Sequence, residues 1–243
     1  MAIPLGPLCL SDSAAKARAW QYSRPLGRTN VELGTVRGFD VGLPIHFHDE
    51  DQITFVLSGS RRFVINGELI RVAPDEGRHI PAGVPHRSLA EDAELFCINI
   101  YKLPGEGTEA DLISNLACFR RRHGFLDWTD LTTIIEEHCT NAGLSSTQMC
   151  EMPSGMGQWH TVSEAAHFSG MSREAFSRRF RRLHGIPPQA FQLLEKLNDA
   201  RRLLRKGDSI ADVAVQTGFA DQSHLGRLFR RAFGVTPGRY RAG

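Results

Sequence analysis

Arg178 and Arg227 occupy the same position in a pattern that occurs twice near the C-terminus, at a shift of 49 residues. An arginine can hold guanine through paired hydrogen bonds to O6 and N7, which give about 1–3 kcal/mol of discrimination between bases. Six further identities recur at this shift: Ala165/Ala214, Phe180/Phe229, Arg181/Arg230, Arg182/Arg231, Gly185/Gly234 and Pro188/Pro237. A repeat this regular indicates two copies of one structural unit.

Each copy has the pattern of a helix-turn-helix unit, in which a first helix holds a second helix in the major groove of DNA. We expect helices over 162–168, 172–184, 188–206, 209–217 and 221–233. Ser172 and Asp221 are suitable N-cap residues, Pro188 suits a first helical turn, and the glycines at 185, 207 and 234 stand where helices end.

One face of each second helix is apolar, and the opposite face is polar and basic. Residues early in these helices should meet base edges, whereas later arginines should meet phosphates. The residues expected at phosphates are Arg173, Arg181, Arg182, Gln222, Arg230 and Arg231. The joining helix 188–206 is about 28 Å long at 1.5 Å per residue, close to the 34–36 Å repeat of DNA. We therefore expect contacts to two successive major grooves on one face.

The positive charge of the chain is concentrated in the same region. Residues 159–243 hold 15 Lys and Arg against 7 Asp and Glu, whereas residues 1–158 hold 14 against 20. Because neutralising phosphates releases condensed counterions, a basic domain of this kind is expected to bind double-stranded DNA.

His46 and His48 lie two residues apart in a region that predicts short strands, so both side chains should point to one face of a sheet. The expected strands are 31–39, 45–47, 52–57, 61–65, 68–72, 77–80, 86–89 and 94–101. Their even spacing predicts a small antiparallel barrel or sandwich. Asn66-Gly67 predicts a type I′ hairpin turn, because both residues tolerate a positive φ.

Helical spacing returns after residue 108. Helices are expected over 109–122 and 128–141, with apolar stripes that would pack either on the barrel or against a second subunit. Residues 142–158 are rich in Gly, Ser and Met and are expected to form a linker. The five cysteines form no CxxC pair, and no apolar run reaches membrane-spanning length, so we expect reduced thiols, no membrane and a cytoplasmic protein.

The segments 200–204, 210–225 and 229–241 resemble the AraC/XylS family of bacterial transcription regulators, and the resemblance covers residues 159–243 without a gap. One departure is that Pro153 and its neighbouring glycines interrupt the helix that the family usually has before the first copy. The resemblance implies an activator or repressor that works with RNA polymerase, commonly as a homodimer. By that resemblance the base-contacting positions are Glu174, Ser177, Arg178, Ser223, His224 and Arg227.

The segments 42–52 and 81–86 are similar to the two motifs of cupin domains, in which an HxH pair, a Glu and a later His bind a metal inside a barrel. By this resemblance His46, His48, Gln52 and His86 are the candidate effector or metal residues, with Gln52 in the place of the Glu. Three imidazoles and an amide oxygen could bind Zn, Ni, Fe or Mn, or they could line a polar pocket for an organic effector, or the histidines could be structural.

We therefore expect an α+β protein of two domains: an N-terminal antiparallel, cupin-like β-barrel with trailing helices, and a C-terminal all-α domain of two helix-turn-helix units. The expected regions are an N-terminal segment 1–29, a sensor barrel 30–105, helices 106–141, a linker 142–158 and the DNA-binding domain 159–243. The expected function is regulation of transcription by a small-molecule or metal effector, without catalysis. The alternatives are a metal-dependent cupin enzyme fused to a DNA-binding domain, and an alkyl-transfer DNA-repair regulator, which the scattered cysteines disfavour.

Overall fold

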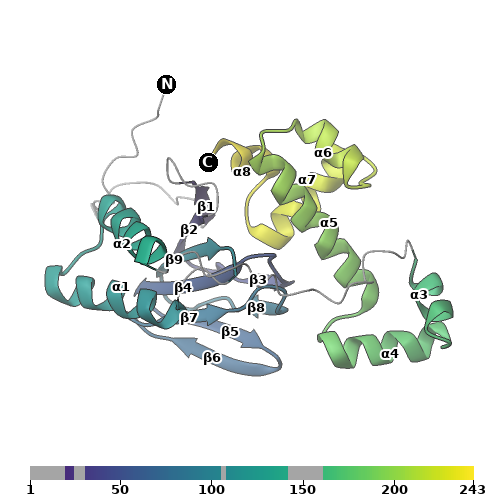
Figure 1. Ribbon diagram of the computed structural model, residues 1–243, viewed down its shortest axis with the longest axis horizontal. Coiled ribbons are helices and arrows are strands. Elements are labelled where there is room, and N and C mark those ends of the chain that lie inside the picture. The colour runs from purple at the N-terminus through teal and green to yellow at the C-terminus, as the bar shows by residue number, and fades with distance from the viewer. Residues whose placement is uncertain (1–19, 25–30, 105–107, 142–160) are drawn as a thin grey trace.

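The computed structural model describes residues 20–24, 31–104, 108–141 and 161–243, and the expected linker lies outside them. The N-terminal half contains two antiparallel sheets that face each other (Figure 1). The five-stranded sheet has the order β1 (Trp20–Ser23), β2 (Val31–Gly38), β9 (Leu95–Lys102), β4 (Asp51–Ser58) and β7 (Gly77–Ile80). The four-stranded sheet has the order β3 (Leu43–His46), β8 (His86–Ser88), β5 (Arg61–Ile65) and β6 (Glu68–Val72).

The Asn66-Gly67 turn joins β5 to β6 as predicted. Asn66 has φ 53° and Gly67 has φ 85°, the positive values that a type I′ turn requires. The turn fixes the register of this hairpin, in which Ile65 pairs with Glu68 and Arg61 with Val72.

Alternation along the central strands separates two apolar layers. Val36, Val56 and Cys97 point between the two sheets, where they join the core that also contains Phe63 and Val72. The residues that alternate with them point to the opposite face of the five-stranded sheet, and they are Leu33, Ile53, Phe55, Ile98 and Ile100.

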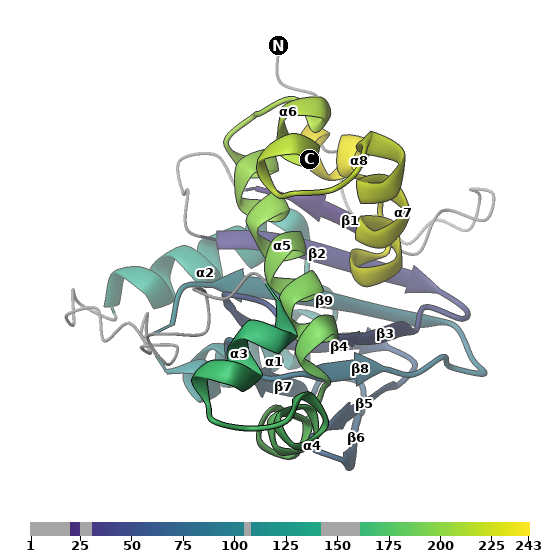
Figure 2. The same cartoon turned by 90° about the vertical axis from the view of Figure 1, so that its right-hand side faces the viewer.

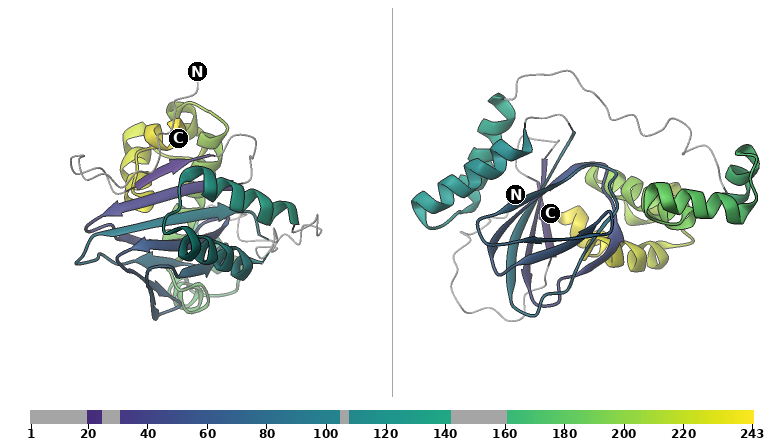
Figure 3. Two further views of the ribbon diagram at one scale, coloured as in Figure 1. Left: turned by 90° about the vertical axis from the view of Figure 1, so that its left-hand side faces the viewer. Right: turned by 90° about the horizontal axis from the view of Figure 1, so that it is seen from below.

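Helices α1 (Glu109–His123) and α2 (Trp128–Asn141) cover that opposite face (Figure 3, left). Leu112 and Leu116 of α1 and Leu131 and Ile135 of α2 are buried against the sheet residues. Of the two arrangements that the sequence allowed, the structure therefore shows the stripes packed on the chain's own sheet.

The C-terminal half is helical, and its helices have the expected signals at their ends. The helices are α3 (Val162–Phe168), α4 (Arg173–His184), α5 (Pro188–Arg205), α6 (Ile210–Gln216), α7 (Gln222–Phe233) and α8 (Pro237–Ala242). Ser172 and Asp221 accept backbone hydrogen bonds as N-caps, and Gly185 and Gly234 end α4 and α7 with φ 75° and 77°. The two helix-turn-helix units are thus α3–α4 and α6–α7, joined by α5.

Three features of the fold differ from the prediction. Strand β1 and helix α8 were not predicted, and they contact each other at the boundary between the two halves. Strand β3 ends at His46, so His48 lies in the following loop rather than on the strand. The register between β3 and β8 is irregular between Leu43 and His46, where Pro44 has no N–H to donate to a ladder.

In the described part of the chain, no helix has both the length and the apolar character needed to cross a membrane.

Candidate functional site

Three histidines meet between the two sheets. His46 at the end of β3 pairs with His86 at the start of β8, and the loop after β3 brings His48 beside them. The ring centroids are 4.4 Å apart for His46 and His86 and 4.9 Å apart for His46 and His48. One nitrogen of each ring lies within 4.8 Å of a nitrogen of each other ring, and all three side chains are buried. The residues grouped from the motifs therefore converge, although His48 leaves the strand.

Burial keeps these imidazoles neutral. Removal from water lowers the pKa of His46 and His48 well below the ordinary value of 6.5, and it lowers the pKa of His86 to about 4. Nδ1 of His46 lies 2.8 Å from the carbonyl oxygen of Pro44, and Nδ1 of His86 lies 2.9 Å from that of Val84. Neutral imidazoles oriented by backbone carbonyls are the usual form of histidine metal ligands.

Gln52 belongs to a polar group on the same interior face. Its Nε2 donates to Oγ1 of Thr54 at 2.9 Å and to Oδ1 of Asn99 at 3.1 Å. Its Oε1 is buried without a hydrogen-bond partner among the described residues, as are Nε2 of His48 and Nε2 of His86. Three orphaned buried polar atoms are costly unless a ligand satisfies them, so this group of side chains fits a metal ion or a polar effector.

Thr54 and Asn99 belong to the polar group around Gln52 and were not predicted from the sequence. Both stand at alternate positions of otherwise apolar strands, Thr54 with Gln52 in β4 and Asn99 with Tyr101 in β9. A polar residue at every second position of a buried strand marks an inward polar face, and this pattern is visible in the sequence.

Helices α4 and α7 present the residues expected to read DNA. Arg178 and Arg227 are exposed at matching positions, and so are the expected phosphate residues and Glu174 and Ser223. Ser177 and His224 are half-buried, and the ring of His224 packs edge-on against Phe219 at 5.5 Å. The buried faces are held by Phe180 in one copy and by Leu225 and Phe229 in the other.

Comparison with known proteins assigns both halves. Residues 165–243 match a family described as a helix-turn-helix domain, and residues 39–101 match the cupin domain. The C-terminal part is 35% identical over 85 residues to the transcriptional regulator MtrA of Neisseria gonorrhoeae, covering 35% of this chain and 28% of that protein. It is 38% identical over 86 residues to the transcriptional activator RhaS of Klebsiella pneumoniae, covering 35% and 30%. The chain thus joins a part that matches the cupin domain to a part that matches a helix-turn-helix domain.

The likeness of the whole fold extends over both domains. The crystal structure of unsaturated fatty acid bound ToxT from Vibrio cholerae matches with a TM-score of 0.51 and 12% sequence identity, covering 90% of this chain and 97% of that one. At this identity the likeness concerns the fold alone. The chain spans about three tenths of the length of the curated relatives that match its helix-turn-helix domain.

A buried ion network, consisting of Glu32, Glu50, Arg201, Arg205 and Tyr240, joins the cupin domain to the helix-turn-helix domain. Arg201 of α5 is 1% exposed, and its guanidinium lies 2.6 Å from Glu32 and 3.2 Å from Glu50. The hydroxyl of Tyr240 donates to Glu32, and Nε of Arg205 donates to Tyr240 at 2.8 Å. This interdomain ion network was not predicted from the sequence.

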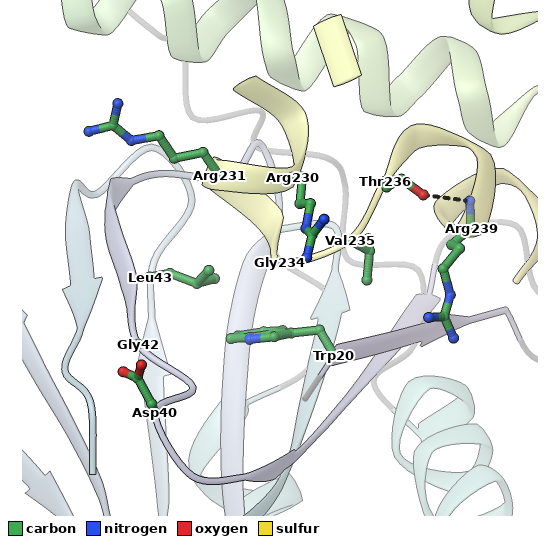
Figure 4. A pocket seen from close by; sticks show the side chains of 10 residues that line it. All are labelled: Trp20, Asp40, Gly42, Leu43, Arg230, Arg231, Gly234, Val235, Thr236 and Arg239. Carbon is green, nitrogen blue, oxygen red and sulfur yellow. Dashed lines mark hydrogen bonds between the residues drawn. The ribbon is translucent and has the colours of Figure 1, made fainter. Parts of the chain in front are cut away.

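Beside the network, β1 packs on the end of α7. The hydroxyl of Tyr22 donates to the backbone oxygen of Phe233 at 3.1 Å, and the indole of Trp20 lies against Gly234. A cavity of about 390 Å³ opens next to Trp20 and Asp40, with Arg230, Arg231 and Arg239 on its other wall (Figure 4). Two of the expected phosphate-binding arginines, Arg230 and Arg231, therefore line a cavity that cupin residues also line.

Proposed function

We propose that the protein is a transcription regulator that binds specific DNA through α4 and α7 and whose cupin pocket senses an effector. The observation that carries this proposal is the buried contact between His48, in a polar and partly unsatisfied cluster of the cupin domain, and Arg201 of a repeated helix-turn-helix domain. The relatives of that domain are transcriptional regulators, which supports a non-catalytic role. Since its partner is the chromosome, we place the protein in the cytoplasm, at the nucleoid when it is bound.

The proposed base contacts are those made by Glu174, Ser177, Arg178, Ser223, His224 and Arg227, with the phosphate contacts made by the surrounding polar and basic residues. Because the two copies differ at the first positions of each helix, one subunit should recognise an asymmetric site. A homodimer and a contact with RNA polymerase remain predictions, which light scattering and transcription with purified polymerase would test.

The arrangement of the two reading helices supports regulation by a conformational change. Figure 2 looks along α4, whereas α7 runs from top to bottom of the same view, so the two helices are not parallel. Successive major grooves on one face of straight DNA present the same orientation, and similar helices entering both should be roughly parallel. The described arrangement therefore corresponds to a state without bound DNA. An effector would shift the population toward a second conformation, in which α4 and α7 fit successive grooves.

As the effector we propose a divalent metal ion held by His46, His48 and His86. The support is the unpartnered, buried Nε2 of His86, whose lone pair is fixed by the bond from Nδ1 to Val84, together with the same tautomer at His46. Bound there, the ion would cross-link β3 to β8. Gln52 stands where the cupin motif has its Glu, and a neutral amide in place of a carboxylate predicts weak, reversible binding. An organic polar effector would use the same orphaned atoms.

Selection of DNA sequences from a random pool by the full chain, at about physiological salt, tests the regulator proposal. We expect an asymmetric consensus whose affinity exceeds that for random DNA by about a thousandfold or more. Binding without sequence preference would contradict it. Equilibrium dialysis of the metal-free protein against Zn²⁺, Ni²⁺, Fe²⁺ and Mn²⁺ tests the effector separately.

A further inference from the structure

His48 belongs both to the histidine cluster and to the interface with the helix-turn-helix domain. Its ring lies 5.4 Å from that of His86, and its Nδ1 lies 2.9 Å from Nη1 of Arg201. Arg201 is also fixed by Glu32 and Glu50 and lies over the rings of Tyr101 and Phe233 at 5.2 and 5.0 Å. A change at the histidine cluster can therefore reach α5 through a single hydrogen bond.

The positions of the ring protons follow from the partners of each Nδ1. A carbonyl oxygen only accepts, so His46 and His86 carry their protons on Nδ1, where they donate to Pro44 and Val84. In a neutral ring this leaves the lone pair on Nε2. These two histidines are thus preset to bind a metal through Nε2.

His48 has the opposite tautomer. A guanidinium only donates, so Nη1 of Arg201 donates to Nδ1 of His48, and the proton of the neutral ring must be on Nε2. That Nε2 is buried, and its proton has no acceptor among the described residues. While Arg201 is in place, the cluster offers two lone pairs and one N–H instead of three lone pairs.

We propose that Arg201 and a divalent metal ion compete for the tautomer of His48, so that metal binding releases α5 from the cupin domain. When the ion bonds to Nε2 of His48, the proton that leaves Nε2 is replaced by one on Nδ1, and the ring stays neutral. The new Nδ1–H points at Nη1 of Arg201, where two donors face each other and the hydrogen bond is lost. By reciprocity, docking of Arg201 weakens the metal site.

The charges of the interdomain ion network also favour release of α5 when a metal ion binds. The guanidinium of Arg201 beside His48 repels a cation in the cluster, and release of α5 takes both Arg201 and Arg205 away from Glu32 and Glu50. Uncompensated buried carboxylates are unfavourable, and a nearby divalent cation offsets part of that cost. This inference rests on the metal effector proposed above, and its tests distinguish the failure of one from the failure of the other.

The first test compares Co²⁺ and Zn²⁺ affinities of full-length variants in competition with a chromophoric chelator. Arg201→Met removes the donor to His48 and should tighten binding about tenfold or more. Arg205→Gln weakens the same network without touching His48, and it should give a smaller gain. Arg62→Gln breaks an ion pair with Glu91 inside the cupin domain and should bind metal like the wild type. Equal affinity of R201M and the wild type would overturn the competition.

The second test uses Trp20 as a reporter and does not depend on a variant of the network. The chain has three tryptophans, so Trp128→Phe with Trp159→Phe leaves Trp20, which is 6% exposed beside Gly234. Titration with Zn²⁺ should shift its emission to the red and increase quenching by acrylamide, with saturation at one ion per chain. Saturable binding without a change at Trp20 would refute the coupling and leave the metal effector standing. Absence of metal binding in the wild type and in R201M would refute both.

Long-range proton–nitrogen spectra of the histidine rings provide a readout that a merely structural arginine would not affect. In the metal-free wild type, His48 should show the Nε2–H form, and His46 and His86 the Nδ1–H form. In Arg201→Met the ring of His48 should gain the Nδ1–H form. An Nδ1–H form of His48 in the metal-free wild type would overturn the proposal.

Discussion

Gly234 lies so close to the indole of Trp20 that a β-carbon on it would be 2.5 Å from the ring. Gly234 ends α7 with φ 77°, and Trp20 is on β1 of the cupin domain, so a helix end of one domain packs on a strand of the other. Gly185 ends α4 in the same way, with φ 75°, but a β-carbon there would meet nothing within 4 Å. Of the two equivalent helix ends, the end of α7 therefore packs on the cupin domain, whereas a β-carbon at the end of α4 would touch no neighbour.

Alanine substitutions at these two glycines distinguish the free-energy cost of backbone strain from the cost of disturbed packing between the domains. Gly185→Ala should cost about 1 kcal/mol of unfolding free energy, because alanine disfavours a left-handed conformation. Gly234→Ala should cost the same amount plus about 1–3 kcal/mol for the overpacked contact with Trp20. Urea denaturation followed by circular dichroism measures both. In a Trp20→Ala background the excess cost of G234A should disappear, and an excess that persists would show that the contact is not its source.

Arg178 and Arg227 are expected to read bases, and their removal should relax sequence preference. Arg227→Ala should weaken binding to the selected site by about 5- to 150-fold, equivalent to 1–3 kcal/mol, and abolish discrimination at one base pair. Arg182→Ala removes a proposed phosphate contact, so it should weaken binding to all sequences and lower the salt slope by about one. Fluorescence anisotropy on a panel of single-base variants distinguishes the two patterns. A uniform loss for R227A would contradict base reading.

The half-buried Glu195 gives the chain a pH dependence. Burial raises its pKa to about 7 from the ordinary 4.5, and the neighbouring charges of Asp199 and of Asp49 in the cupin domain add to the shift. A raised pKa means that the folded chain holds this proton when the unfolded chain has lost it. The unfolding free energy therefore falls as the pH rises from about 4.5 to above 7.

Glu195→Gln should remove that loss. After discounting for solvent screening, we expect the variant to be more stable than the wild type by about 1 kcal/mol at pH 8 and nearly equal to it at pH 4. Glu68→Gln, on the exposed strand β6, should leave the pH profile unchanged. Thermal unfolding across this pH range is the measurement. A stability difference that does not vary with pH would rule out Glu195 as the source.

The sequence predicted the parts of the molecule that are determined locally. The Asn66-Gly67 turn, the caps at Ser172 and Asp221 and the repeated apolar faces of α4 and α7 each depend on a few neighbouring residues, and the structure confirms them. The approach of the three histidines followed from motifs whose two short segments lie together in the cupin domain.

The parts that were not predicted depend on distant partners. Strand β1 has four residues and is held by β2 on one side and by α7 and α8 on the other. Arg201 follows Leu194 and Leu197 on the buried stripe of α5, a spacing that should have marked it as buried. Its partner Glu32 lies 169 residues away, and sequence alone does not show which carboxylate meets a given arginine.

A variant of Glu32 tests how the contact between the two domains affects DNA affinity. It accepts hydrogen bonds from Arg201 and Tyr240, and it pairs with Arg205 at 3.1 Å. Glu32→Gln removes the charge that holds two arginines of α5, so it should favour the undocked state. If the docked arrangement keeps α4 and α7 from entering successive grooves, E32Q should raise DNA affinity about tenfold in the absence of effector.

Glu91 supplies the matched control. It is buried to a similar degree and pairs with Arg62, but both residues belong to the cupin domain. Glu91→Gln should therefore lower the stability of the cupin domain while leaving both DNA affinity and the emission of Trp20 as in the wild type. If E32Q instead lowers DNA affinity, the docked arrangement is the one that binds DNA, and the effector must act by strengthening the interdomain ion network rather than by breaking it.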